Sequence, residues 1–225
     1  MRGLDFVAAS CGHRYTSGMC HHYVGAKKHP ELYAGAFDIH STLFEFTLPN
    51  YWPLSKVPII RPNDNGEREM VPAEWGLLPF WWKPTDKAPK RSGFQRKCFN
   101  AKSEEVDKKP SYREAFKRRR CLMPAEEFFE KGHYFHLPDF TPFAFAGLWE
   151  RWRHGEETVE SCTLLTTEPN ELVKSVGHHR MPVLLTNEEQ YAQWLNPDIV
   201  ERKVLEPLFL PTDPATMEFY KAPEK

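Results

Sequence analysis

The 225-residue chain has a formal net charge of −1, with 40% hydrophobic and 27% charged residues. This is the composition of a soluble globular protein, and the length suits one well-cored domain better than two. The chain has no run of about 18 apolar residues, which excludes a helical membrane span. Five cysteines without a CxxC pair argue against a zinc cage and favour a reducing compartment, so the expected location is cytoplasmic.

Charge is unevenly distributed along the chain. Residues 83–120 contain fourteen Lys or Arg and five Asp or Glu, a net charge of +9, so the remainder carries −10. A basic block inside a mildly acidic protein is typical of a surface that binds a polyanion. A solvated loop and helix face would have the same composition.

Residues 1–18 do not resemble part of a folded domain, and we interpret them as a leader or a misassigned start, with the domain proper at 19–225. Short helices are expected in five places. They cover 30–37, 111–120, 169–176, 190–195 and 198–205. Two are expected to begin at capping boxes, Ser111-x-x-Glu114 and Thr186-x-x-Glu189.

Strands are expected where aromatic and β-branched residues alternate or cluster. The predicted strands cover 57–60, 121–124, 128–131, 134–137, 143–149, 159–166, 181–185 and 217–220, and a turn occupies 50–53. Short strands follow one another with few crossover helices. We therefore predict an α+β fold: a single domain with a largely antiparallel, barrel-like sheet and short helices at its rim.

Four segments that are far apart in the sequence each place a reactive or orienting side chain beside a turn. They supply a thiol at Cys20, a neutral amide in 99–104, a carboxylate in 125–130 and an imidazole in 177–182. Each of these residues, taken alone, is more often structural. The carboxylate is the more suggestive, because burial beside aromatic residues would raise its pKa towards the range useful for proton transfer.

Cys20 directly follows a methionine, Met19. If Met19 is the initiator and is removed, Cys20 has a free α-amine beside its thiol, and both are partly nucleophilic near neutral pH. Such a pair can capture an aldehyde as an imine and then close a five-membered thiazolidine. While residues precede Cys20, its nitrogen is an amide, and the thiol could attack but not close this ring.

Six motifs occur in the order and approximate spacing of one family. They are Met19-Cys20, Asn50-x-x-Pro53, Trp75-Gly76-Leu77-x-Pro79-x-Trp81, Asn100-Ala101-x-x-Glu104, Phe128-Phe129-Glu130 and His178-x-Arg180-Met181-Pro182. Over about residues 19–223 the chain resembles the SRAP family, the SOS response-associated peptidase domains, also called abasic-site processing proteins.

This resemblance implies a monomeric domain that binds single-stranded DNA and crosslinks abasic sites, with no cofactor or metal. By position, Cys20 would form the thiazolidine with the ring-opened sugar aldehyde, and Asn100 would hold the cysteine and the sugar. Glu130 would act as acid and base, and His178 would assist proton transfer, lyase chemistry and reversal. The protein would associate with the nucleoid in a bacterium and lie in the nucleus of a eukaryote.

The resemblance also implies a set of DNA-binding residues. Arg180 and Lys102 would contact phosphates, Trp81 or Trp82 would support a base or the site wall, and Asn50 completes the set. Charge combined with stacking is how proteins hold single strands without reading their sequence.

The chain departs from the usual family motifs in four places. Cys20-His21-His22 replaces Cys-Gly-Arg, Asn100-Ala101-Lys102 replaces Asn-Ala-Arg, Glu126-Glu127 replaces Asp-Gly, and Lys131 replaces a tryptophan. The first two changes remove an arginine and a bidentate fork, and so imply a weaker grip on phosphates.

Three other functions remain open. A thiol peptidase or self-processing protein would use Cys20 as nucleophile, His178 as base and Asn100 as orienting group. A plain single-strand-binding module would need the basic block and the tryptophans but no cysteine. A metal site built from Cys20, His178 and the two histidines at 21–22 is disfavoured, because adjacent histidines rarely point the same way.

Overall fold

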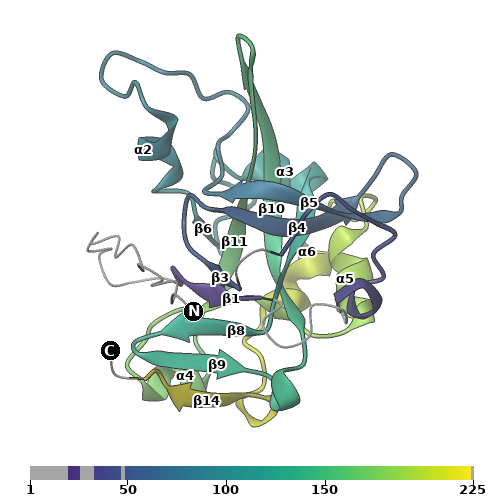
Figure 1. Cartoon of the computed structure of the whole chain (residues 1–225), viewed down its shortest axis with the longest axis vertical. Helices are drawn as coiled ribbons and strands as arrows, with labels where there is room; N and C mark the ends of the chain where they lie inside the picture. The colour runs from purple at the N-terminus through teal and green to yellow at the C-terminus, as the bar shows by residue number, and fades with distance from the viewer. Residues whose placement is uncertain (1–19, 26–32, 47–48, 224–225) are drawn as a thin grey trace, which may run out of the picture.

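Five strands close into a barrel at the centre of the molecule (Figure 1). The computed structural model describes residues 20–25, 33–46 and 49–223. The barrel strands are β4 (Lys56–Pro62), β5 (Arg68–Trp75), β7 (Arg120–Ala125), β10 (Phe143–His154) and β11 (Glu157–Thr167). They pair in the order β11-β10-β7-β4-β5, and β5 pairs back onto β11 in parallel. The prediction of an α+β domain with a barrel-like, largely antiparallel sheet is confirmed.

Four short strands extend this barrel sheet. They are β2 (Ser41–Thr42), β6 (Asn100–Lys102), β12 (Met181–Pro182) and β13 (Leu184–Leu185). Strand β6 runs parallel to β11, with Asn100 opposite Leu164, and β12 pairs with the end of β11. These pairings bring the segments around Asn100 and Arg180 to the same end of β11.

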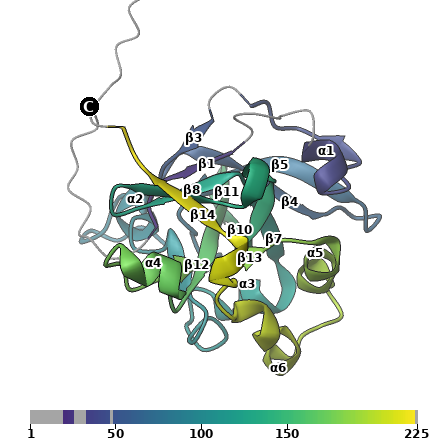
Figure 2. The same ribbon diagram turned by 90° about the horizontal axis from the view of Figure 1, so that it is seen from below.

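A second, antiparallel sheet lies below the barrel in Figure 1, in the order β14-β9-β8-β1-β3. Its strands are β1 (Tyr23–Val24), β3 (Asn50–Tyr51), β8 (Glu127–Glu130), β9 (His133–His136) and β14 (Glu218–Lys221). Viewed from below in Figure 2, β14 runs across the middle of the molecule, with α4 (Glu171–Ser175) and α5 (Glu188–Leu195) on opposite sides. This sheet carries the cysteine segment.

The remaining helices are short and lie around the barrel (Figure 2). They are α1 (Tyr33–Ala36), α2 (Arg91–Gln95), α3 (Arg113–Arg118) and α6 (Arg202–Leu205), with single 3₁₀ turns at 138–140, 206–209 and 214–216. In the part of the chain that the structure describes, no helix is both long and apolar enough to cross a membrane.

Both predicted capping boxes are wrong. Helix α3 begins at Arg113, and its N-cap residue, Tyr112, makes no side-chain cap. Helix α5 is capped one residue later than predicted, because the Asn187 side chain accepts a hydrogen bond from the backbone N–H of Gln190 at 3.0 Å. Asparagine is a stronger N-cap than threonine, which explains the shift.

Several predicted boundaries also need correction. The expected turn at 50–53 begins with strand β3, and the strand expected at 181–185 is two short strands that pair with different partners. Of the helix expected at 198–205, only the last turn forms, as α6. Strand β5 and helix α2 were not predicted, and residues 30–32 of the first expected helix lie outside the described residues.

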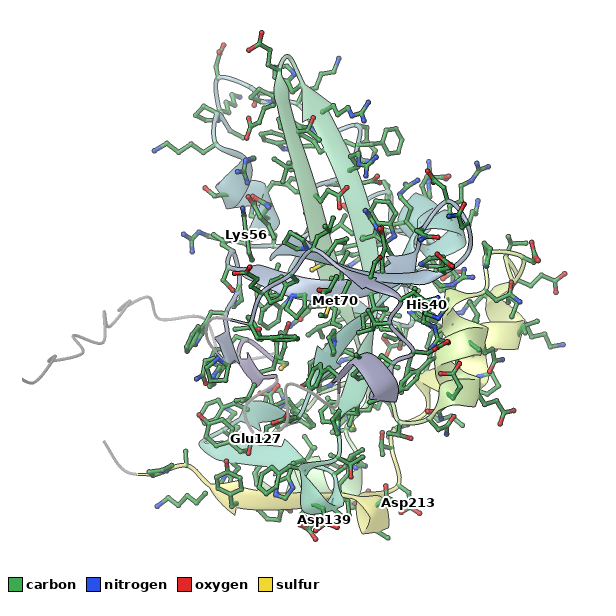
Figure 3. All side chains as sticks on the ribbon, turned by 45° about the vertical axis from the view of Figure 1, so that its right-hand side comes forward. His40, Lys56, Met70, Glu127, Asp139 and Asp213 are labelled. Atoms are coloured by element: carbon green, nitrogen blue, oxygen red, sulfur yellow. The ribbon has the colours of Figure 1, made fainter. Side chains whose placement is uncertain are left out.

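The hydrophobic core is divided into two large clusters and one small one. One large cluster fills the space between the barrel and the second sheet, and includes Cys20, Tyr23, Trp75 and Phe128. The other packs the helices against the barrel and includes Met70, which Figure 3 shows inside the molecule, whereas His40 and Lys56 lie on its surface. The small cluster packs Leu78 and Trp82, from the segment after β5, against Trp152 and Val159 of the long β10–β11 hairpin.

Candidate active site

The thiol of Cys20 is buried where the second sheet meets the barrel. Its sulfur donates to the carbonyl oxygen of His22 at 3.6 Å and interacts with the carboxyl group of Glu130. Burial, with the negative charge of Glu130 adding to it, raises the pKa of the Cys20 thiol well above its ordinary value. The group is therefore a protonated thiol near neutral pH, rather than a preformed thiolate.

Glu130 is held at the end of β8 by a tight turn. Lys131 and Gly132 both have positive φ, at 48° and 79°, and Glu130 pairs with His133 across them. This is the geometry of a two-residue hairpin of the primed type, for which glycine at the second position is favoured. The turn fixes the carboxyl group beside Cys20.

The Glu130 side chain is only 2% exposed, and no guanidinium or ammonium group of the described residues forms an ion pair with it. Its Oε2 lies 3.1 Å from Nε2 of His178, while Oε1 accepts no well-directed hydrogen bond from the described residues. Burial raises the pKa of Glu130 to about 8. Near neutral pH this residue is therefore largely a carboxylic acid that can donate a proton.

His178 completes the contact chain from the other side of Glu130. It follows α4 and the Gly177 turn, where a positive φ of 77° just past the helix C-cap is a common helix stop. Its Nδ1 lies 2.5 Å from the carbonyl oxygen of Arg180, and because a carbonyl can only accept, Nδ1 carries the proton. Burial lowers the pKa of His178, so Nε2 presents a lone pair to the acid of Glu130.

Asn100 fixes the backbone of Cys20. Its Nδ2 donates to the carbonyl oxygen of Cys20 at 2.7 Å. The asparagine is itself held by the pairing of β6 with β11 and by Tyr112, whose hydroxyl donates to the carbonyl of Asn100 at 3.2 Å. Its Oδ1 is buried without a hydrogen-bond partner in the described part of the chain, so it is an acceptor available to a bound molecule.

The structure therefore brings together all four predicted catalytic side chains. The thiol, the acid and the imidazole contact one another in that order, and the Asn100 side chain is hydrogen-bonded to the backbone carbonyl of Cys20. Within the described residues, no group of three or more His, Cys, Asp or Glu could hold a metal ion. His22 points to Asn50 and Trp52, with its Nε2 2.9 Å from Asn50 Oδ1.

Both predicted phosphate contacts, Arg180 and Lys102, lie close in sequence to residues of this site, His178 and Asn100. Arg180 forms a two-bond ion pair with Glu104, at 2.6 and 2.9 Å, and also donates to the carbonyl of Thr166. This pairing lowers the pKa of Glu104, and the charge of Lys102 lowers it further. Lys102 is exposed on β6, so it is the freer of the two cations.

The two predicted tryptophans have different environments. Trp81 is 43% exposed and donates its indole N–H to the carbonyl of Pro110. Trp82 is 7% exposed, packs against Trp152 and belongs to the small cluster, whereas Cys20 belongs to a different one. Trp82 also lines two adjoining cavities of about 480 and 380 Å³ near α2, together with Lys90.

The basic block is partly structural. Arg120 is buried and donates to three backbone carbonyls, those of Phe116, Trp194 and Asn196. Arg91 and Arg119 are each paired with glutamates. The charge of residues 83–120 therefore overstates what this segment offers to a polyanion.

Sequence reasoning missed Trp52 and the contacts of His22. Their rings stack with a centroid distance of 4.8 Å and an interplanar angle of 1°. Treating 50–53 as a turn concealed this, because the antiparallel register of β1 and β3 is what sets His22 opposite Trp52. An assignment of Asn50 and Tyr51 to a strand would have revealed the pair.

The chain is similar in sequence to abasic site processing proteins. YoqW of Bacillus subtilis, an abasic site processing protein, is 36% identical over 169 residues, which cover 71% of either chain. HMCES of Xenopus tropicalis, also an abasic site processing protein, is 26% identical over 207 residues, 76% of this chain and 59% of HMCES.

Solved structures agree with the fold. A protein from Bacteroides thetaiotaomicron superposes with a TM-score of 0.75 at 25% identity, over 90% of this chain and 91% of that one. A protein from Bordetella bronchiseptica also gives 0.75, at 24% identity, over 91% of this chain and all of that one. The profile of the family described as SOS response associated peptidase, SRAP, matches residues 19–225. The chain belongs to the SRAP family, as its motifs predicted.

Proposed function

We propose that this protein binds single-stranded DNA and captures abasic sites covalently, through the α-amine and thiol of Cys20 in a chain that starts at this residue. The observation that carries the proposal is the contact chain from the Cys20 thiol through the buried acid of Glu130 to the imidazole of His178. The names of the relatives support the substrate, and the family match, which begins at residue 19, supports the position of the mature N-terminus.

The first step is formation of an imine. The amine of Cys20 adds to the aldehyde carbon of the ring-opened sugar and gives a carbinolamine. Glu130, held protonated by burial, donates its proton to the carbinolamine hydroxyl, which leaves as water. The products are an iminium ion and the Glu130 carboxylate, with His178 close enough to share the proton.

The second step closes the ring. The Glu130 carboxylate takes the proton of the Cys20 thiol, and the sulfur adds to the iminium carbon. The iminium nitrogen becomes a neutral secondary amine in a five-membered thiazolidine, and Glu130 is again protonated. The net reaction joins one aldehyde to one amine and one thiol with loss of one water, so no other reactant is needed.

The surroundings of the thiol suit a sugar rather than a peptide. Oδ1 of Asn100 is buried without a hydrogen-bond partner among the described residues, and Oε1 of Glu130 accepts no well-directed hydrogen bond from them, so the hydroxyl groups of an opened sugar could donate to both. We assign the adjoining phosphates to Lys102, which is exposed, and to Arg180, and Asn50, Trp81 and Trp82 remain predicted DNA contacts.

A thiol peptidase using the same residues has less support. Such an enzyme needs an imidazole that activates the nucleophile. Here Nε2 of His178 faces the carboxyl group of Glu130, and the pKa of the thiol is raised rather than lowered. A peptide substrate would also leave the raised pKa of Glu130 without a role.

The test is covalent capture. Protein that starts at Cys20 is mixed with a single-stranded oligonucleotide containing one abasic site and then denatured. We expect an adduct that survives denaturation, and none from Cys20→Ala. An adduct of equal yield from Cys20→Ala would overturn the proposal.

A further inference from the structure

A row of aromatic rings crosses the second sheet, beginning two residues from Cys20. Tyr23 of β1 and Phe128 of β8 point into the core, where both contact Phe145. Because neighbouring residues of a strand face opposite sides, His22 and Phe129 lie on the other face. Continuing the registers of β1 with β3 and β8 places His22 between Trp52 and Phe129, and the Phe129 N–H donates to the His22 carbonyl at 3.0 Å.

The first two rings form a parallel stack with one side open. Trp52 and His22 are separated by 4.8 Å between centroids and are parallel within 1°. His22 is buried, and its Nε2 donates to Oδ1 of Asn50 at 2.9 Å, which fixes the plane of the imidazole. Trp52 is 47% exposed although His22 covers one of its faces. Its accessible surface is therefore the opposite face and the edge.

The remaining rings brace this stack. Phe129 lies 5.5 Å from His22 between centroids, Tyr134 lies 5.1 Å from Phe129, and Tyr220 lies 5.4 Å from Tyr134 in a stacked arrangement. The Tyr220 hydroxyl donates to Oε1 of Glu127 at 2.6 Å, and Glu127 is labelled on this sheet in Figure 3. His22 is thus supported from the sheet side, and Trp52 is the end of the row that faces solvent.

The position of the row relative to the thiol indicates what would occupy the open face. The carbonyl of His22 contacts the Cys20 sulfur at 3.6 Å, while its imidazole backs Trp52, so one residue connects both sites. An abasic nucleotide has no base of its own to stack. The rings nearest to the thiol in such a strand are the bases on either side, and stacking on an aromatic face accepts any base.

We propose that the open face of Trp52 stacks on the nucleobase adjacent to the abasic sugar held at Cys20, with His22 as its rigid backing. The proposal rests on the proposed function, since it takes single-stranded DNA as the ligand. It adds a binding subsite for the neighbouring nucleotide, built from Trp52, His22 and Asn50.

The experiment measures equilibrium binding of two oligonucleotides that carry a stable, unreactive abasic analogue at the centre. One has ordinary bases on both sides, and the other has further abasic analogues in place of the two neighbouring bases. Wild type is compared with Trp52→Ala, Trp52→Phe and the control Phe80→Ala, which removes an exposed aromatic ring outside the row. Covalent capture of a reactive abasic oligonucleotide by wild type is measured alongside.

We expect Trp52→Ala to weaken binding of the first oligonucleotide by about tenfold and that of the second by less than about twofold. Trp52→Phe should recover most of the loss, and Phe80→Ala should bind both like wild type. Equal binding of the first oligonucleotide by Trp52→Ala and wild type would overturn the stacking proposal, as would an equal loss on both oligonucleotides or no binding by wild type. A failure of covalent capture by wild type with the Trp52 effect intact would instead count against the proposed chemistry alone.

Discussion

Two buried carboxylates, Glu130 and Glu150, show what distinguishes the candidate active site from the rest of the interior. Glu150 lies on β10, where Oε2 accepts from Arg119 at 2.8 Å and Oε1 accepts from the backbone N–H of Arg151 at 3.1 Å. Glu130 faces a thiol and an imidazole, and its Oε1 accepts no well-directed hydrogen bond from the described residues. Burial raises the pKa of both carboxyl groups, but at Glu150 the charge of Arg119 opposes the effect.

The difference separates a structural acid from a reactive one. A buried carboxylate with a guanidinium partner remains charged and holds two elements together. A buried carboxyl group without a cation keeps its proton to near neutral pH and can give it to a substrate. The following predictions test this distinction, from the largest expected effect to the smallest.

Replacing the two acids should separate catalysis from structure. Glu130→Gln should slow thiazolidine formation by about 10²-fold or more, the usual scale for loss of a general acid and base. Glu150→Gln should change the rate by less than about twofold. The measurement is the single-turnover rate of adduct formation with an abasic oligonucleotide in excess. Similar rates for both variants would remove the special status of Glu130.

The pH dependence of stability should differ in the same way. With a folded pKa of about 8 against an ordinary value near 4.5, Glu130 is protonated in the folded protein and ionised in the unfolded chain throughout that window. The folded state then binds more protons, so the stability contributed by Glu130 falls as pH rises from about 4.5 to 8. Glu130→Gln should therefore gain stability relative to wild type as pH increases, as measured by urea unfolding at several pH values.

Glu150→Gln provides the contrast in that experiment. It leaves the Arg119 guanidinium without its carboxylate, so it should destabilise the protein by about 1–3 kcal/mol at neutral pH. If both substitutions destabilise equally at pH 8, the acid at Glu130 is not held neutral by burial.

The pH dependence of the capture rate should report the protonation state of Glu130. Adduct formation by wild type should fall above about pH 8, as the acid loses the proton that it donates to the carbinolamine. Glu130→Gln, though slow, should lack this falling limb. The check is a rate profile between pH 6 and 10 at constant ionic strength. A falling limb that persists in Glu130→Gln would assign it to another group.

Glu104 is a third carboxylate, at the surface, and its replacement should have the smallest effect, a change in the affinity for single-stranded DNA. It occupies the Arg180 guanidinium that we propose to hold a phosphate. Glu104→Gln should tighten binding of single-stranded DNA a few-fold, whereas Lys102→Ala should weaken it and reduce the slope of log K against log salt by about one unit. The affinity of each variant for single-stranded DNA is measured by fluorescence anisotropy across a salt series. If both substitutions change the affinity in the same direction, the DNA does not contact Arg180 and Lys102 as proposed.

The sequence predicted much of the fold because its strands are strongly patterned. The strands expected at 121–124, 128–131 and 134–137 are rich in aromatic and apolar residues. The first forms within Arg120–Ala125, and the other two form one residue earlier than expected, at Glu127–Glu130 and His133–His136. Strand β5 was missed because Arg68, Glu69 and Glu74 interrupt it and Pro72 breaks the strand pattern. Its Pro72 is tolerated opposite Pro58 of β4, a pairing that no local pattern reveals.

The site residues could be selected from the sequence, but their order in space could not. Cys20, Glu130 and His178 were each singled out, yet nothing local shows that the acid separates the thiol from the imidazole. That arrangement depends on the hairpin turn at Lys131 and Gly132 and on the turn at Gly177 that follows α4. It changes the interpretation, because a thiol beside an imidazole favours peptidase chemistry and a thiol beside an acid favours capture of an aldehyde.

The central claim is that both the nitrogen and the sulfur of Cys20 bond to the sugar. Its most direct test is the intact mass of the product from two proteins, one starting at Cys20 and one keeping an uncleavable segment in front of it. We predict that only the first gives an adduct stable to denaturation, with the mass of protein plus oligonucleotide minus one water. An adduct of equal yield and stability from the blocked protein would contradict the account and show that the thiol acts alone.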